Sequence, residues 1–148
     1  YLAVSLDRRG AGSAGGCCSL GPWPFVSGCA EVSAVLTVAH WVKETLSRDV
    51  WLVGVSAGGP IAGAALGRLP FARGYVGIAH TFGLVTTLIF FCNTARLLVS
   101  RKPKLFIMGT SDTFTSVAVF YSQMALMRRP REWHIEPGAG HFDIELRP

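Results

Sequence analysis

The sequence predicts an α/β fold, a mostly parallel sheet with helices on both faces, in a single domain over residues 1–148. Short apolar runs alternate with stretches of helical periodicity along the chain, without internal repeats or low-complexity linkers. Hydrophobic residues make up 50% of the 148 residues and charged residues 16%, which excludes a disordered chain. A chain of this size can bury a core without disulfides or a metal ion.

Five short segments are predicted to be strands. Tyr1–Leu6 is rich in strand-forming residues and ends at a turn-prone segment. Val50–Val53 is continuously apolar, which is typical of a strand buried on both faces. The other three predicted strands are Tyr75–Ala79, Leu105–Met108 and Glu132–Glu136.

Helices are predicted between these strands, after a Gly/Pro/Cys-rich loop that runs to about Ala30. Glu31–Arg48 has helical spacing, with one apolar face formed by Val32, Val35, Leu36, Ala39, Val42 and Leu46. Ala57–Leu69 is small and apolar and is expected to pack closely, and Leu84–Leu98 and Thr115–Met127 complete the set. Because ligands of such sheets bind beyond the carboxyl ends of the strands, functional residues are expected directly after strands.

The net charge of +5 comes from scattered basic residues and two clusters, Arg101-Lys102-Lys104 and Arg128-Arg129-Arg131. Both clusters are interpreted as solvated faces, and without interleaved aromatic residues no nucleic-acid partner is expected. The four cysteines form no C-x-x-C pair and have no histidine at zinc-ligand spacing. We therefore expect no metal site, and reduced thiols, which weakly favour a cytoplasmic location.

The uncharged stretch from Tyr75 to Cys92 is long enough to suggest a membrane span. His80, several threonines and two glycines interrupt it, so a buried strand followed by an apolar helix is the preferred interpretation, and no membrane span is expected. The chain opens at Tyr1 without a signal-peptide pattern, and the missing methionine suggests a fragment.

A candidate nucleophile follows the second predicted strand. Gly54-Val55-Ser56-Ala57-Gly58 has the G-x-S-x-G pattern and stands between a strand and a helix. Glycine at both flanking positions is expected to relieve crowding in the tight turn and leave the Ser56 hydroxyl projecting. The Ala57 N–H, at the start of the following helix, is a candidate donor to an oxyanion. The alternative is a serine that caps a helix beside structural glycines.

A base and an orienting acid are expected later in the chain, since serine is a weak nucleophile without them. Asp112 follows the Leu105–Met108 strand and His141 follows the Glu132–Glu136 strand, in the order Ser…Asp…His. The alternatives are a turn-capping aspartate and an ordinary loop histidine.

Other histidines and carboxylates are weaker candidates. His80 follows the Tyr75–Ala79 strand and is a candidate for substrate contact, whereas His40 and His134 lie within a predicted helix and strand and are interpreted as structural. Asp143 lies near His141 but follows no strand, which makes it the weaker acid candidate.

These segments together resemble the α/β-hydrolase superfamily over nearly the whole chain, and more narrowly its small serine-aminopeptidase and dienelactone-hydrolase-like branch, including uncharacterised plant proteins. The motifs are Asp7–Ser13, Val53–Gly63, Phe82-Gly83-Leu84, Lys102–Ser116 and Gly138–Phe142. The resemblance implies that Ser56 is the nucleophile, Asp112 the orienting acid, His141 the general base and the Ala57 N–H half of the oxyanion hole.

Two features of the superfamily are missing from the sequence. The resemblance implies a strand upstream of Tyr1, followed by a His-Gly loop that supplies the second oxyanion donor. In the superfamily that strand lies between those corresponding to Tyr1–Leu6 and Val50–Val53, so its loss would leave a gap or force the two to pair. The helix that normally follows the base is expected to be missing too, since the sequence stops at Pro148, and we interpret the chain as an incomplete α/β-hydrolase domain.

The sequence therefore predicts hydrolysis of an ester, thioester or amide through an acyl-enzyme, without a cofactor. A small acyl substrate is the expected partner, and the apolar Thr81–Leu98 segment is expected to line its pocket. The alternatives are a non-catalytic protein that binds a small ligand on the same fold, and an inert truncated product.

Overall fold

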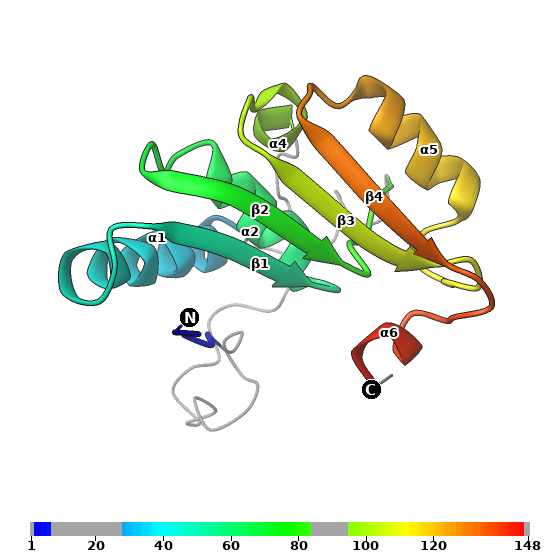
Figure 1. Cartoon of the computed structure of the whole chain (residues 1–148), viewed down its shortest axis with the longest axis horizontal. Coiled ribbons are helices and arrows are strands. Elements are labelled where there is room, and N and C mark those ends of the chain that lie inside the picture. Colours follow the sequence, from blue (N-terminus) through cyan, green and yellow to red (C-terminus); the bar gives the residue numbers. More distant parts are fainter. Residues whose placement is uncertain (1, 7–27, 84–94, 147–148) are drawn as a thin grey trace.

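The computed structural model describes residues 2–6, 28–83 and 95–146 of the chain. It contains a parallel four-stranded sheet in the order β1-β2-β3-β4, with helices on both sides (Figure 1). The strands are β1 (Val50–Val55), β2 (Ala72–Ile78), β3 (Lys104–Gly109) and β4 (Arg131–Glu136). The helices are α1 (Gly28–Thr45), α2 (Gly58–Leu66), α4 (Ala95–Val99), α5 (Val117–Leu126) and α6 (Asp143–Leu146).

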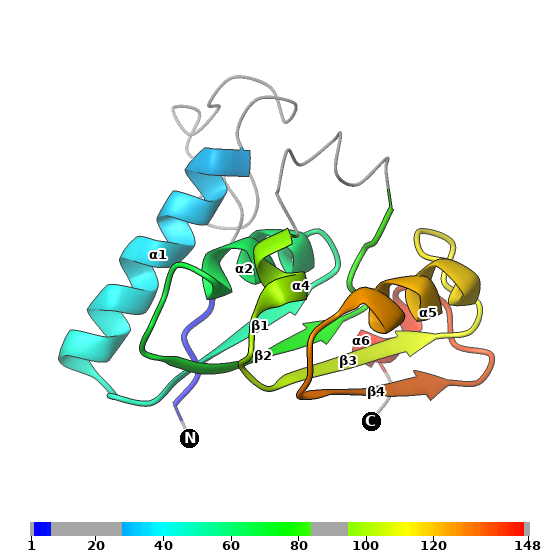
Figure 2. The ribbon, with the colours of Figure 1, turned by 90° about the horizontal axis from the view of Figure 1, so that it is seen from above.

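Parallel pairing requires the chain to return to the start of the sheet after each strand, and helices make the return. α2, α4 and α5 connect successive strands, and together with α1 they lie on one face of the sheet (Figure 2). All four strands therefore end at the same edge, and the segments after β1, β2, β3 and β4 meet there.

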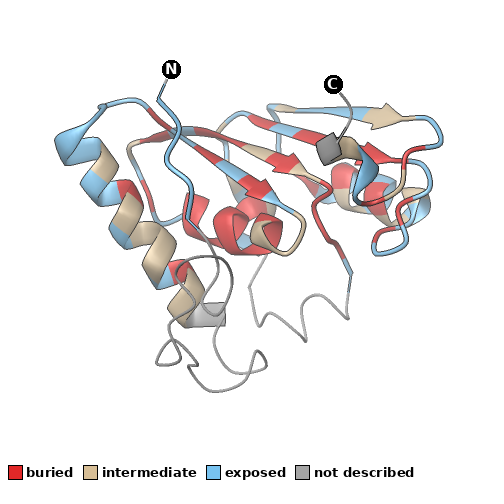
Figure 3. Ribbon diagram, turned by 90° about the horizontal axis from the view of Figure 1, so that it is seen from below, coloured by how far each residue is buried: buried red, intermediate tan, exposed pale blue. Residues whose placement is uncertain are grey.

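The core lies between α2 and the sheet, where buried residues concentrate (Figure 3). Residues 59–66 of α2 are all buried, and their small size allows close approach to neighbouring elements. A Cβ on Gly63 would lie 2.8 Å from the Leu97 Cδ2 atom of α4. Large side chains from the sheet and α5, including Tyr75, Phe106 and Phe120, complete the core, and each contributes roughly 1.5–3 kcal/mol by leaving water.

The predicted strands from residue 50 onward are confirmed, with ends that differ by a few residues. The predicted apolar face of the first helix is also confirmed for Val32, Val35, Leu36, Ala39 and Val42, whereas Leu46 lies beyond the end of α1 and is exposed. The loop before Ala30 and most of the predicted Leu84–Leu98 helix lie outside the described residues; within that helix, α4 covers Ala95–Val99.

Two predictions about strands are wrong. Residues 2–6 form no strand and are exposed, because an extended segment becomes a strand only by pairing, and β1 pairs with β2 alone within the described residues. β1 is not buried on both faces, since its burial alternates and leaves Trp51, Val53 and Val55 exposed. The helices that pack on β1 cover one face of it, and an apolar run cannot report which faces are covered.

Candidate active site

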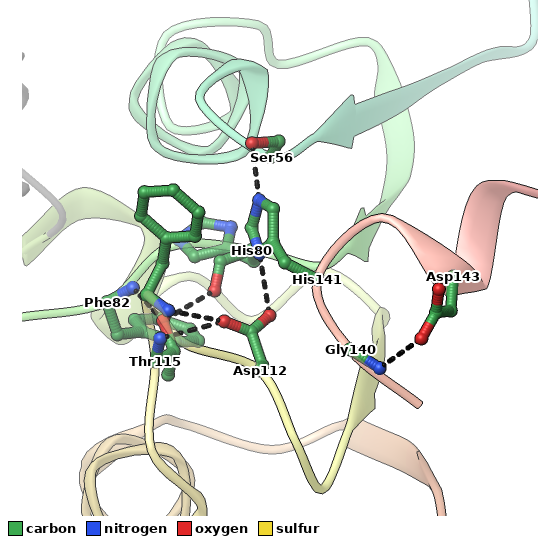
Figure 4. Close-up of polar contacts among 9 residues, drawn as sticks. Ser56, His80, Phe82, Asp112, Thr115, Gly140, His141 and Asp143 are labelled. Carbon is green, nitrogen blue, oxygen red and sulfur yellow. Dashed lines mark hydrogen bonds and ion pairs between the residues drawn. The ribbon is translucent and has the colours of Figure 1, made fainter. Parts of the chain in front are cut away.

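Ser56 sits in a sharp turn between β1 and α2, with a left-handed backbone at φ 49°. Its N–H still donates to the Ile78 carbonyl of β2 at 2.9 Å, and its carbonyl accepts from Gly59 N–H at 2.9 Å. Two bonds thus hold a conformation that costs roughly 1–2 kcal/mol for a residue with a Cβ. The turn presents the hydroxyl to the His141 imidazole (Figure 4).

The two glycines flanking Ser56 have different surroundings. A Cβ on Gly54 would lie 2.8 Å from the Gly58 carbonyl oxygen and 2.8 Å from the Gly59 Cα, which are backbone atoms that cannot move aside. A Cβ on Gly58 would have no heavy atom within 4 Å. Crowding therefore explains the glycine before Ser56, and the same explanation for Gly58 is wrong.

The structure brings Ser56, His141 and Asp112 together from three separate loops (Figure 4). Ser56 Oγ lies 2.7 Å from His141 Nε2, and His141 Nδ1 lies 2.7 Å from Asp112 Oδ2. The side chains of His141 and Asp112 are 2% and 1% exposed. A serine hydroxyl, an imidazole and a carboxylate in this geometry form an uninterrupted hydrogen-bonded relay.

The loop after β3 fixes the Asp112 carboxylate through two backbone N–H groups. Its Oδ1 accepts from the N–H groups of Phe114 at 2.8 Å and Thr115 at 2.9 Å. Oδ2 is left to accept from His141 Nδ1–H, because an ionised carboxylate only accepts hydrogen bonds. That places the imidazole proton on Nδ1 and leaves Nε2 bare to accept the Ser56 hydroxyl proton.

Thr115 ties this loop to the end of β2 and was not singled out from the sequence. Its Oγ1 donates to the His80 carbonyl at 3.3 Å and accepts from Phe82 N–H at 2.9 Å. The side chain is buried, so the bond to Phe82 satisfies an N–H that water cannot reach. The sequence offers no local signal for this link, because Thr115 lies 33 residues from Phe82 and 35 residues from His80.

His80 lies beneath the turn at Ser56, buried at 3% exposure rather than open to solvent. Tyr75 Oη donates to the Gly59 carbonyl at 3.0 Å and lies 2.7 Å from His80 Nδ1. The single phenolic proton is used on Gly59, so His80 Nδ1–H is the donor in the second bond. Burial lowers the pKa of His80 to about 3 and raises that of Tyr75, so both are neutral at physiological pH. Substrate contact by His80 stays a prediction.

Two aromatic rings flank the His141 imidazole. The sequence did not predict this arrangement, because Phe114 is near His141 only in the folded chain and adjacency alone does not place the Phe142 ring. The ring centroid of Phe114 lies 4.4 Å from that of His141, and that of Phe142 lies 4.9 Å away. Both phenylalanines are largely exposed while His141 is 4% exposed, so they shield the imidazole from water.

The remaining candidates lie away from the relay. Asp143 Oδ2 accepts from Gly140 N–H at 2.7 Å and so fixes the loop that carries His141, without contacting the imidazole (Figure 4). His40 lies in α1 and His134 in β4, as predicted, and both are exposed. The Ala57 N–H has no acceptor among the described residues and stands at the start of α2. The predicted pocket wall at 81–98 is described only at its two ends.

Residues 2–6, 28–83 and 95–146 contain neither a cluster of metal-ligating side chains nor an apolar helix of membrane-spanning length. No group of three or more His, Cys, Asp or Glu side chains is placed to hold a metal ion there. In the same ranges no helix combines the length and the apolar character that a bilayer crossing requires.

Comparison with solved structures shows which known fold this architecture matches. A serine hydrolase homologue from Coxiella burnetii matches with a TM-score of 0.71 and 24% identity, over 93% of this chain and 62% of that one. A lidless serine hydrolase from Xanthomonas campestris matches with a TM-score of 0.70 and 20% identity, over 94% and 56%. The chain has the α/β-hydrolase fold.

An esterase domain from Rhodothermus marinus also has this α/β-hydrolase fold, with a TM-score of 0.63 and 14% identity over 80% of this chain and 63% of that one. This chain thus spans 56% to 63% of the length of the three structures. No protein-family profile matches the chain, and no curated protein sequence matches it at a significant level.

Proposed function

We propose that this α/β-hydrolase-fold chain is a serine hydrolase that cleaves an ester, thioester or amide through an acyl-enzyme, with Ser56 as nucleophile, His141 as general base and Asp112 as orienting acid. The single observation that supports it best is the relay of two 2.7 Å contacts from Ser56 Oγ through His141 to Asp112. Serine hydrolases and esterases among the similar structures agree with this proposal.

In the first half of the proposed reaction, Ser56 Oγ attacks the substrate carbonyl carbon while His141 Nε2 takes the hydroxyl proton. The carbonyl oxygen becomes an oxyanion, and in this proposal the Ala57 N–H at the start of α2 donates to it. Asp112 stabilises the imidazolium that has formed. The bond to the leaving group then breaks, and His141 returns the proton to that group, which leaves the acyl chain on Ser56.

In the second half, a water molecule replaces the leaving group. His141 Nε2 takes a proton from the water as its oxygen attacks the acyl carbon, and the proton is returned to Ser56 Oγ as the ester bond breaks. The products are a carboxylic acid and the free enzyme, and no electron acceptor or cofactor takes part. The exposed rings of Phe114 and Phe142 beside His141 favour an apolar group on the side where the leaving group departs.

Labelling with a fluorophosphonate probe tests the proposal, because the probe phosphonylates a serine only when that serine is activated. We expect the chain to be labelled, Ser56→Ala to be unlabelled and Ser111→Ala to keep the label. Ser111 is a matched control, since it is an exposed serine next to Asp112. Its backbone N–H donates to the Ala139 carbonyl, and this bond does not involve the hydroxyl that the substitution removes. A well-folded chain that resists the probe would instead support a non-catalytic binding protein.

A further inference from the structure

Positive charge is concentrated at one end of the molecule. The chain has 14 Lys and Arg residues, and apart from Arg8, Arg9 and Arg147 all of them, eleven, fall within the described residues. These eleven lie in the last turns of α1 and α4, in the connections that lead into strands, or in the first two residues of β2, β3 and β4. They therefore gather at the amino-terminal end of the sheet, opposite the edge that carries Ser56 (Figure 1).

Carboxylates do not balance this charge. Among the described residues Arg73 is the one cation of this group in an ion pair, with Asp49 at 2.6 Å. Lys102 and Lys104 donate instead to backbone carbonyls, including those of Pro70 and Ser100. Helix carboxyl ends attract cations, but that attraction accounts for one or two per helix and acts only within the last turn.

Two cations are held side by side at the start of the sheet. Lys104 and Arg131 are directly paired in the register of β3 and β4, where like charges destabilise a sheet. Lys104 is buried, and the Arg131 Nε is buried with no hydrogen-bond partner among the described residues. Burial and the charge of Arg131 lower the pKa of Lys104 to about 8.

A cleft of about 420 Å³ opens at the same end, between the end of α2 and α4. Four cations line it and no carboxylate does: Arg68, Arg96, Arg101 and Lys102. Its remaining walls are largely apolar and include Leu66, Leu69 and Val99. Leu66 and Leu69 are fully buried, so Val99 is the exposed side chain of these three. A cationic cleft beside an exposed aliphatic side chain matches an anionic head attached to an apolar body.

Exposed aliphatic side chains stand among these cations. Val99 at the end of α4 is 64% exposed, and Leu126 at the end of α5 is 70% exposed. The Arg128 N–H donates to the Leu98 carbonyl at 2.8 Å, which joins the end of α4 to the turn after α5. Cations with protruding aliphatic residues fit a lipid surface, whereas single-stranded nucleic acid would call for aromatic residues on which bases stack.

We propose that the amino-terminal end of the sheet docks onto an anionic lipid surface, with a lipid phosphate group in the cleft between α2 and α4. Val99 and Leu126 enter the headgroup layer, and the cations around them contact phosphates. In this orientation the edge with Ser56 faces away from the membrane, open to solution. Docking is independent of the proposed hydrolysis.

Sedimentation with lipid vesicles tests the proposal on the full chain. We expect the chain to bind phosphatidylcholine vesicles that contain phosphatidylserine, to release them at high salt, and to ignore phosphatidylcholine alone. Replacing the exposed Arg96, Arg101 and Arg128 with glutamine should weaken partition about 100-fold, at about five-fold per cation. The matched triple lysine variant keeps the charge and should bind within about three-fold of the parent.

Three further measurements distinguish a lipid surface from free phosphate and from nucleic acid as the ligand. Val99→Ser with Leu126→Ser should weaken vesicle binding about ten-fold, because aliphatic insertion is lost while the charge is kept. Thermal unfolding with inorganic phosphate reports a site for free phosphate, and a labelled RNA oligonucleotide reports nucleic-acid binding. The proposal is overturned if the folded chain does not bind the anionic vesicles, even when inorganic phosphate stabilises the chain against heat. It is also overturned if the oligonucleotide binds more tightly than the vesicles and the double serine variant binds vesicles as tightly as the parent.

Discussion

β1 and β2 end with the same backbone conformation, yet the side chains that follow the two strands point in different directions. Each strand is followed by a non-glycine residue in the left-handed region, Ser56 at φ 49° and Ala79 at φ 47°. Each of these residues still donates its N–H to the next strand, Ser56 to Ile78 at 2.9 Å and Ala79 to Ile107 at 2.8 Å.

The difference lies in where the side chain goes. After β1 the strained residue itself carries the hydroxyl, and the turn presents it to His141. After β2 the strained residue is an alanine, and the next residue, His80, is turned inward onto Tyr75. One backbone device therefore exposes a reactive group in one place and buries a histidine in the other, so position after a strand does not by itself make a residue functional.

The largest effect is expected where the relay is broken without a change of shape. In Asp112→Asn an amide replaces one carboxylate oxygen and donates to His141 Nδ1, which moves the imidazole proton to Nε2. The imidazole can then no longer accept the Ser56 proton, and we expect fluorophosphonate labelling to slow by about 10³–10⁴-fold. Near-parent labelling of a folded Asp112→Asn chain would contradict the role of Asp112.

The turn at Ser56 can be perturbed on either side by one methyl group. Gly54→Ala drives a Cβ into backbone atoms at 2.8 Å, and we expect a loss of about 1–3 kcal/mol in unfolding free energy together with slower labelling. Gly58→Ala, where the Cβ meets open space, should change the unfolding free energy by less than about 0.5 kcal/mol. Equal effects in urea unfolding would show that the two sites are not distinguished by crowding.

The buried histidine should make the fold acid-sensitive. Since burial lowers the pKa of His80 to about 3, the unfolded chain binds a proton below its ordinary pKa of 6.5 while the folded chain does not. Stability from this group is therefore present above pH 6.5 and lost as pH falls toward 3, by about 2 kcal/mol between pH 7 and pH 5. His80→Asn keeps a donor to Tyr75 but does not titrate. In urea unfolding, the loss of unfolding free energy from pH 7 to pH 5 should therefore be about 2 kcal/mol smaller in this variant than in the parent.

A smaller effect than those at Asp112, Gly54 and His80 is expected at Thr115. Thr115→Val leaves the Phe82 N–H without its acceptor, which should cost about 1 kcal/mol of unfolding free energy. Thr115→Ser keeps the hydroxyl and should restore most of it. If Thr115 also positions Asp112 through this link, the valine variant labels more slowly than the serine variant; equal labelling would limit Thr115 to stability.

Sequence reasoning succeeded where a pattern is local. The strands β1 to β4 and the polar residues after them could be recognised in the sequence. Because parallel strands end at one edge, Ser56, Asp112 and His141 could be named together. The predicted strand at Tyr1–Leu6 was wrong because strand formation depends on a partner strand. The predicted burial of both faces of β1 was wrong because an apolar run does not show which face is covered. Thr115 Oγ1 contacts residues 33 and 35 positions away in the sequence, and no spacing rule reports such pairs. The burial of His80 was missed because its position after a strand does not show which way its side chain turns.

Mapping the site of covalent modification tests the central claim most directly. The intact chain is treated with a fluorophosphonate, digested, and its peptides are measured by mass spectrometry. We predict one phosphonyl group per chain, on the peptide that contains Ser56. Modification of a different serine, or unmodified peptides from a chain whose folding is verified by circular dichroism, would contradict an activated hydroxyl at the end of β1.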